Sequence, residues 1–282
     1  MVSAASILAC LVTLFISLIL PVLVLIVYGV KNKRQGVASA WLLGALGFLV
    51  PQVFIRLPIL NRLSAASWFL SFSQNHIFLY SLSLAFTAGL FELAGRFAVA
   101  KWMEWKHLTY KTSLAAGLGH GGIEAIVIVG MTYVNNLVIM FMMNSGSFDV
   151  LLNQAAAQGG DTAQLLAIQA AILDTSPGIF LLAGLERLLT MTAHAAMSLI
   201  VCWGVHKSKA GKAALLCLLF HTLIDTTAGI SLLATDLGGS RLSQTAAYVI
   251  IYAILILAAA LSLLVIREIR RRWMAEGKEV ML

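Results

Sequence analysis

The chain has 282 residues, of which 60% are hydrophobic and 11% are charged, and its mean hydropathy is +0.93. A soluble domain carries about 25% charged residues, so this composition excludes soluble, disordered, collagen-like and disulfide-scaffold proteins. The three cysteines lie in apolar runs without CxxC spacing, which predicts that they pack as small apolar residues. An all-α protein embedded in the membrane is the class that remains.

Seven apolar stretches are long enough to cross a bilayer, which takes about 20 helical residues. We expect a single integral membrane domain over residues 1–282, folded as a polytopic transmembrane helical bundle. The long connection 143–176 is expected to be a tether, with a lid as the alternative, and its stretch 162–173 could form a short interfacial helix. The predicted spans are 5–30, 37–57, 65–99, 113–142, 177–205, 212–234 and 243–266.

Positive charge is divided unevenly between the two sets of connections. The positive-inside rule places the richer set in the cytoplasm, so the N-terminus is expected outside and the C-terminus inside. These flanks face anionic lipid, so the net charge of +7 predicts membrane lipids as partners and no nucleic acid. The poorer set holds Arg56, Arg62 and Arg241; the richer set holds Lys31, Lys33, Arg34, Lys101, Lys106, Lys111, Lys207, Lys209, Lys212, Arg267, Arg270, Arg271, Arg272 and Lys278.

Ionisable residues are concentrated in the third to sixth spans. A charge in hydrocarbon costs several kcal/mol, so such residues are candidates for function. Spans one, two and seven have none at their centres, which places the candidate catalytic core in spans three to six. The residues are Glu92 and Arg96 in span three, His120 and Glu124 in span four, Glu186, Arg187 and His194 in span five, and His221 and Asp225 in span six.

The depths of these groups coincide. At about 1.5 Å per residue, one set lies roughly 13 Å from the cytoplasmic lysine of its helix and another roughly 20 Å. We therefore expect side chains from four helices to meet in a water-containing pocket below the inner headgroups. The first set is Glu92, His120 and His221, and the second is His194, Glu124 and Asp225.

Each group also has a structural interpretation. Glu92 and Arg96 are one helical turn apart and could form a structural ion pair, with Arg96 orienting and balancing the acid. His120 could hydrogen-bond between helices, and the glycines around it could serve close packing. We expect a structural role for Glu186 beside Arg187. The shared depth of the remaining groups favours a functional site.

This set of side chains suits peptide-bond hydrolysis inside a membrane. A buried glutamate beside an arginine can act as general base, and histidines can stabilise the oxyanion or protonate the leaving amine. Asp225, one turn from His221, can hold the imidazole tautomer. A zinc site built from His120, His194, His221 and a carboxylate such as Glu124 is chemically possible. The spacing does not choose between metal-free glutamate catalysis and water activated by a metal ion.

At these residues the chain resembles the YhfC-type family of intramembrane proteases, which is related to the CAAX-processing and bacteriocin-immunity (CPBP) superfamily of glutamic-type intramembrane proteases. The superfamily pattern is a Glu motif ending in Arg, then a His motif, then HxxxN or HxxxD. Residues 85–230 carry the resemblance. The matching segments are FELAGR with Glu92 and Arg96, GLGHGGIEA with His120, and FHTLIDTTAG with His221 and Asp225.

The resemblance implies an enzyme of the bacterial cytoplasmic membrane that cleaves membrane-bound or peptide substrates. Glu92 would activate water, His120 and His221 would stabilise the oxyanion, and Asp225 would support His221. The superfamily has two adjacent glutamates, whereas Phe91 and Leu93 flank Glu92 in this chain, so Glu124 is a candidate second acid. We therefore expect a glutamic-type intramembrane endopeptidase with Arg96, Glu124, His194 and Glu186 in support; no cofactor is favoured, and zinc is the possible one.

Two other functions fit the same residues. Buried Glu, Asp and His chains also form proton relays, so a proton-coupled transporter is the first alternative, although no paired halves with matching broken helices are visible. The second alternative is an inactive scaffold that binds peptides, which the single glutamate of FELAGR favours.

Overall fold

The computed structural model describes residues 1–33, 35–106, 108–233 and 243–277, and all regular elements within these ranges are helices. The predicted all-α class is confirmed. The chain divides into two compact units. The small unit comprises Met1–Leu23 and Ala125–Leu188, and the large unit comprises Val24–Glu124 and Leu189–Leu282.

Within the described residues, six helical segments are long and apolar enough to cross a membrane, which identifies an integral membrane protein. A further helix, α12 (Ala210–Leu233), covers the sixth predicted span, whose last residue, 234, lies outside the described residues. The total of seven spans and the orientation stay predictions. Arg34, Arg241 and Lys278, which were used for the orientation, also lie outside the described residues. The six segments are Ala4–Lys31, Val37–Leu63, Ile77–Lys106, Tyr110–Ser145, Pro177–His206 and Gln244–Ala275.

The small unit has its own apolar core. Cys10, Tyr133 and Phe180 pack together in it, and the Tyr133 hydroxyl donates to the Phe180 carbonyl oxygen at 3.1 Å. The predicted helix at 162–173 is present as α10, whereas α9 was not predicted. The elements that begin in this unit are α1 (Ala4–Leu14), the π-helical η1 (Phe15–Ile19), α2 (Leu20–Lys31), the π-helical η3 (Ala125–Gly130), α8 (Met131–Ser145), α9 (Ser147–Ala157), α10 (Ala163–Asp174) and α11 (Pro177–His206).

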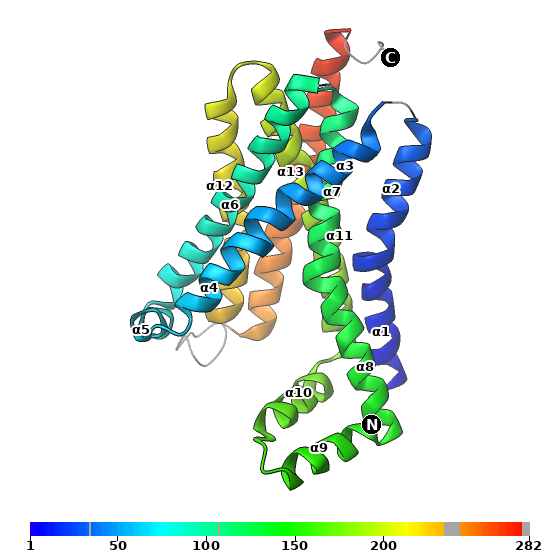
Figure 1. Ribbon diagram of the computed structural model, residues 1–282, viewed down its shortest axis with the longest axis vertical. Helices are drawn as coiled ribbons and strands as arrows, with labels where there is room; N and C mark the ends of the chain where they lie inside the picture. The colour runs from blue at the N-terminus through cyan, green and yellow to red at the C-terminus, as the bar shows by residue number, and fades with distance from the viewer. Residues whose placement is uncertain (34, 107, 234–242, 278–282) are drawn as a thin grey trace. The chain divides into compact units, whose positions relative to one another are not determined.

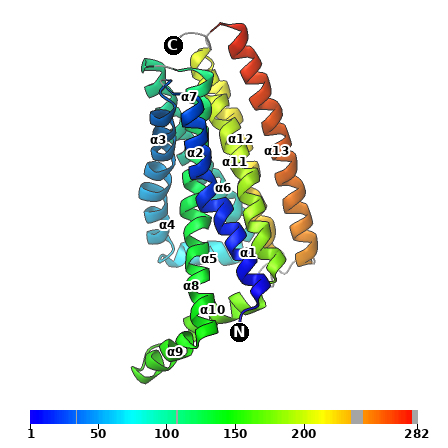
Figure 2. The ribbon, with the colours of Figure 1, turned by 90° about the vertical axis from the view of Figure 1, so that its right-hand side faces the viewer.

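In the large unit α3 packs against α6 and α7, and α12 packs against α6 and α13 (Figures 1 and 2). The second half of α11 also belongs to this unit. These helices bring together the polar residues that the sequence placed at matching depths. The other elements are α3 (Val37–Phe48), the π-helical η2 (Leu49–Arg56), α4 (Leu57–Leu63), α5 (Ser67–Asn75), α6 (Ile77–Lys106), α7 (Tyr110–Glu124) and α13 (Gln244–Ala275).

The predicted spans differ from the helices at two places. The third span, 65–99, is interrupted at His76, whose backbone is not helical (φ −133°, ψ 51°), so α5 ends there and α6 begins at Ile77. The second span was predicted to end at 57 but continues to Leu63. Arg56 is therefore inside a helical segment and buried, not in a connection as the charge count assumed. A hydropathy pattern averages over windows longer than these features, so it does not resolve such short interruptions and helix ends.

Glycines allow α3 and α7 to pack with their backbones in contact. A Cβ atom at Gly119 would overlap the carbonyl oxygen of Trp41, and one at Gly44 would overlap that of Ala116. Small residues at such crossings let membrane helices approach closely. The packing role considered for the glycines around His120 is thus observed, and it fixes the helix that carries this histidine.

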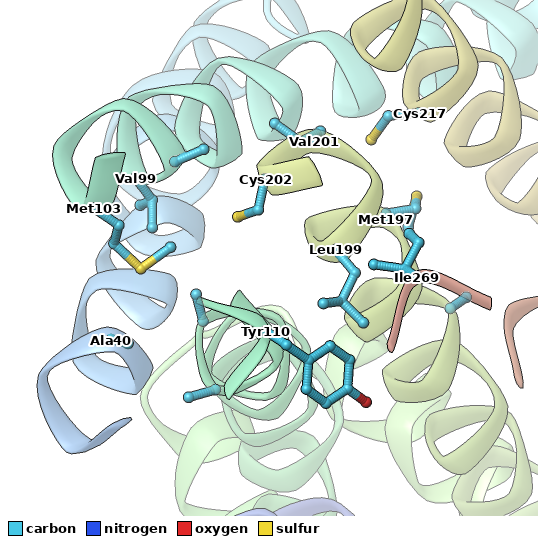
Figure 3. Packing of buried hydrophobic residues seen from close by; sticks show 14 of the residues in the cluster. Ala40, Val99, Met103, Tyr110, Met197, Leu199, Val201, Cys202, Cys217 and Ile269 are labelled. Atoms are coloured by element: carbon cyan, nitrogen blue, oxygen red, sulfur yellow. The ribbon is translucent and has the colours of Figure 1, made fainter. Parts of the chain in front are cut away.

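The apolar core of the large unit lies where several helices meet. Figure 3 shows Val99 and Met103 of α6 near Tyr110 of α7 and Cys202 of α11. The expected burial of the cysteines is confirmed, since Cys10, Cys202 and Cys217 are all buried and free.

Candidate metal and catalytic site

Glu92 is the centre of a polar cluster in the large unit. It projects from α6, and only 3% of its surface is exposed. Arg96, one turn further along the same helix, places Nη2 3.2 Å from Glu92 Oε2. An unpaired carboxylate buried in this way would cost free energy, because burial disfavours its negative charge. The guanidinium of Arg96 compensates that charge.

Three histidines from three other helices surround the same carboxylate. His221 Nε2 of α12 is 2.8 Å from Glu92 Oε2, and His120 Nε2 of α7 is 3.0 Å from it. His194 Nδ1 of α11 is 3.7 Å away. The imidazoles of His120 and His194 are stacked, with ring centroids 5.4 Å apart. The predicted convergence of four helices is therefore observed; we call Glu92, Arg96, His120, His194 and His221 the buried cluster.

Two further carboxylates lie behind the histidines. Glu124 Oε2 is 2.8 Å from His194 Nε2, and Asp225 Oδ2 is 3.3 Å from His221 Nδ1. Each carboxylate thus faces the imidazole nitrogen that points away from Glu92. Histidines that bind metals commonly donate their other N–H to a carboxylate, which fixes the tautomer and raises ligand basicity.

Arg96 has further hydrogen-bonding capacity. Its Nη2 also lies against His194 Nδ1, and because a guanidinium only donates, this nitrogen accepts. A neutral His194 then carries its proton on Nε2, facing Glu124. Arg96 Nε and Nη1 are buried without a hydrogen-bond partner among the described residues. Buried donors of this kind are costly and are suited to an acceptor brought by a bound molecule.

The buried cluster is closed in the part of the chain that the structure describes. His120 and His221 are 1% and 2% exposed, so both imidazoles are buried, and the water-containing pocket expected from the sequence stays a prediction. Asp225 and Glu124 are more accessible, with 34% and 15% of their side chains exposed. Water would reach the cluster from the side of these two carboxylates.

Local packing holds the histidines in place. The edge of Phe48 contacts the face of His120, with ring centroids 5.4 Å apart, and Phe48 is 1% exposed. A Cβ at Gly121 would lie 2.9 Å from His194 Cβ, so only glycine leaves room for that side chain. Sequence reasoning missed Phe48, because a phenylalanine in an apolar span carries no signal of its own.

The other predicted site residue, Glu186, belongs to the small unit. It forms an ion pair with the neighbouring Arg187, in agreement with the structural role expected for it. A buried cation that the sequence did not assign to the core is Arg56. Its Nη2 donates to the Leu84 carbonyl oxygen at 2.7 Å.

One group of side chains in the described residues could hold a metal ion. It comprises Glu92, His194 and His221, whose ligand atoms all lie within 4.8 Å of one another. The sequence suggested His120 and Glu124 as ligands as well, whereas this group contains Glu92 in their place. One carboxylate and two imidazoles form the ligand set of several catalytic zinc sites.

The distances also fit such an ion. Two atoms bonded to one tetrahedral zinc ion lie about 3.4 Å apart. The Glu92–His221 and Glu92–His194 distances of 2.8 and 3.7 Å fall on either side of that value. The carboxylates behind both histidines complete the pattern of a metal site.

The fold and the cluster together define a polytopic membrane protein with a buried Glu/His centre. Residues 16–237 match the family model described as YhfC intramembrane metalloprotease, and the chain belongs to this family. It is 30% identical over 199 residues to an uncharacterized membrane protein YhfC from Bacillus subtilis (strain 168), with 70% of this chain and 75% of the relative covered. No solved structure matches the chain.

Proposed function

We propose that this protein is an intramembrane endopeptidase that cleaves peptide bonds of membrane-associated substrates and holds a zinc ion on Glu92, His194 and His221. One observation carries the proposal: these three side chains converge while the outer nitrogen of each imidazole faces a carboxylate. When bound, zinc supplies Lewis-acid chemistry that makes water a nucleophile at neutral pH. The family to which the chain belongs supports a protease of this kind.

Glu124 and Asp225 act as positioning residues. Because they face His194 Nε2 at 2.8 Å and His221 Nδ1 at 3.3 Å, they favour tautomers in which the inner nitrogens of both rings are unprotonated and directed at Glu92. Asp225 is the more accessible of the two carboxylates, with 34% of its side chain exposed against 15% for Glu124.

His120 and Arg96 are the groups that bind the reacting carbonyl. His120 lies outside the metal-ligand group, so its Nε2–H, which is 3.0 Å from Glu92 Oε2 in this structure, would pass to a substrate oxygen. Arg96 adds the buried donors Nε and Nη1. Hydrogen-bond donors that are already fixed at the place where negative charge develops stabilise an oxyanion well, because they need little reorganisation during the reaction.

The metal-free mechanism that the sequence favoured makes Glu92 the general base. In this structure its Oε2 lies within 3.2 Å of Arg96 Nη2, His120 Nε2 and His221 Nε2. Nitrogens of three side chains thus already surround the oxygen that would take a proton from water, which favours Glu92 as a ligand over Glu92 as a base.

Metal content and cleavage separate these mechanisms. Purified wild type is expected to contain about one zinc per chain by elemental mass spectrometry, and Glu92→Gln and His221→Ala to lose most of it. Membrane-tethered reporter peptides should be cleaved by wild type, not by these variants, and 1,10-phenanthroline should stop cleavage until zinc is restored. His120→Ala should keep the metal but lose most of the cleavage rate.

Matched controls lie outside the cluster. Glu104→Gln changes an exposed acid of the same helix, and His76→Ala an exposed histidine before it; both should behave as wild type. Cleavage by metal-free wild type would support Glu92 as general base instead. Equal cleavage by wild type, Glu92→Gln and His120→Ala would exclude the hydrolase, and proton-driven uptake without cleavage would favour a transporter.

A further inference from the structure

A second cavity lies in the large unit, away from the buried cluster. It is formed by α11, α12 and α13 and has a volume of about 810 Å³, within the roughly 300–1,000 Å³ range of small-molecule sites. Its lining includes Trp203 and Gly204 near the end of α11. Neither the family nor the proposed hydrolysis assigns a role to it.

One wall of the cavity is apolar and opens onto the outer surface of the helices. Leu216 of α12 and Leu261 and Leu264 of α13 line it, and they are 55%, 47% and 62% exposed. Leu261 and Leu264 belong to a helix that is long and apolar enough to span a membrane, where exposed leucines contact acyl chains. The cavity is therefore accessible to lipid from the side.

Another part of the lining is basic because of a tight turn between α11 and α12. Ser208 adopts a left-handed conformation (φ 54°), and Lys209 N–H bonds back to the Gly204 carbonyl at 2.7 Å. The turn thereby places Lys207, Lys209 and Lys212 on the cavity. A cavity of about 380 Å³ between α3, η2 and α6 is lined instead by apolar side chains and glycines, so the three lysines distinguish the larger one.

Only part of this positive charge is compensated. Lys207 pairs with Glu276 and lies over the Trp203 ring at 5.1 Å. Glu268 lines the cavity and pairs with Arg272 at 2.7 Å. Lys209 and Lys212 form no ion pair among the described residues, and both line the cavity together with the apolar wall.

We propose that this cavity binds an anionic phospholipid, with its phosphate on Lys209 and Lys212 and an acyl chain along Leu216, Leu261 and Leu264. Basic pockets between membrane helices recognise acidic headgroups in this way. A zwitterionic lipid offers the same acyl chains but no net negative charge, so headgroup charge should decide the preference. The site is independent of the metal cluster and of the proposed hydrolysis.

The test compares two lipids on the full-length protein. Binding of dioleoylphosphatidylglycerol and dioleoylphosphatidylcholine would be measured by native mass spectrometry after exchange into detergent. Wild type should prefer the anionic lipid by about tenfold or more. Each lysine near the surface raises the affinity for an anionic lipid about fivefold, so Lys209→Gln/Lys212→Gln should lower phosphatidylglycerol binding about 25-fold. Phosphatidylcholine binding should stay within about twofold of wild type.

The matched control is Lys31→Gln/Lys33→Gln, a basic pair that does not line the cavity. It should keep the wild-type preference. Leu264→Trp, which fills the apolar wall from an exposed position, should weaken binding of both lipids without lowering the melting temperature. Equal binding of the two lipids by wild type would overturn the proposal, and so would equal losses in the control and cavity variants. Displacement of the lipid by a soluble peptide would also overturn it and assign the cavity to a peptide.

Discussion

At the scale of single residues, Glu124 has the most informative position. It is the last residue of α7, directly before the π-helical segment η3, and π-helical turns often occur at functional sites. Its carboxylate meets His194 Nε2 at 2.8 Å and remains partly accessible. A purely structural role for Glu124 would require neither the contact with His194 nor the partial exposure of the carboxylate.

Glu124→Gln therefore tests the role of the outer carboxylates. The amide keeps the shape of the side chain but removes the charge that orients His194. Zinc affinity, measured by competition with a chromophoric chelator, should fall about 10- to 100-fold. Glu186→Gln, in the small unit, is the control and should leave the affinity unchanged. Unchanged affinity in Glu124→Gln would reduce Glu124 to a structural role.

At the scale of helices, the C-terminal end of α13 packs against the C-terminal end of α11. Trp273 is fully buried and lies against Trp203, with ring centroids 4.9 Å apart. Glu276, just beyond α13, accepts from Lys207 and from His206 Nε2, the latter at 2.9 Å. These contacts hold the pKa of the Glu276 carboxyl below its usual value, with Lys207 as the larger cause.

The stability that the Glu276 contacts contribute should depend on pH. A carboxyl whose pKa is lowered in the folded state stabilises the fold above its unfolded pKa, about 4.3 for glutamate, and that stabilisation is lost as pH falls through the lowered value. Wild type should melt at a slightly higher temperature than Glu276→Gln at pH 7, and the difference should shrink as the pH falls below the usual glutamate pKa. A difference in melting temperature that persists or widens at low pH would contradict the stabilising ion pair. Glu104→Gln, which removes a solvent-exposed ion pair, serves as the control.

At the scale of the whole molecule, the buried cluster links four helices of the large unit that are distant in sequence. A metal ion that binds only the folded protein stabilises it by mass action. Saturating zinc should therefore raise the melting temperature by roughly 5–10 °C over the chelated protein. Glu92→Gln should show little of this shift, whereas His76→Ala should show all of it. A full shift in Glu92→Gln would place the bound metal elsewhere.

Local regularities explain which features could be predicted. Apolar stretches longer than a bilayer indicated the helices, and the positions of Glu92, His120 and His221 relative to nearby lysines indicated a common depth, because helical rise is constant. The i, i+4 spacing likewise anticipated the Glu92–Arg96 and His221–Asp225 pairs. The break at His76 and the buried position of Arg56 escaped prediction, since hydropathy averages over such short features.

The sequence by itself determined that this chain is a helical membrane protein with acids and histidines concentrated in a few spans, because length, hydropathy and helical spacing are properties of contiguous residues. Only the tertiary structure decided that Glu92 joins His194 and His221, that Glu124 stands behind His194, and that Phe48 packs on His120. Those contacts depend on how each helix is rotated and how closely its glycines let neighbours approach. Rotation and approach are set by packing between segments far apart in the chain, on which local sequence carries little information.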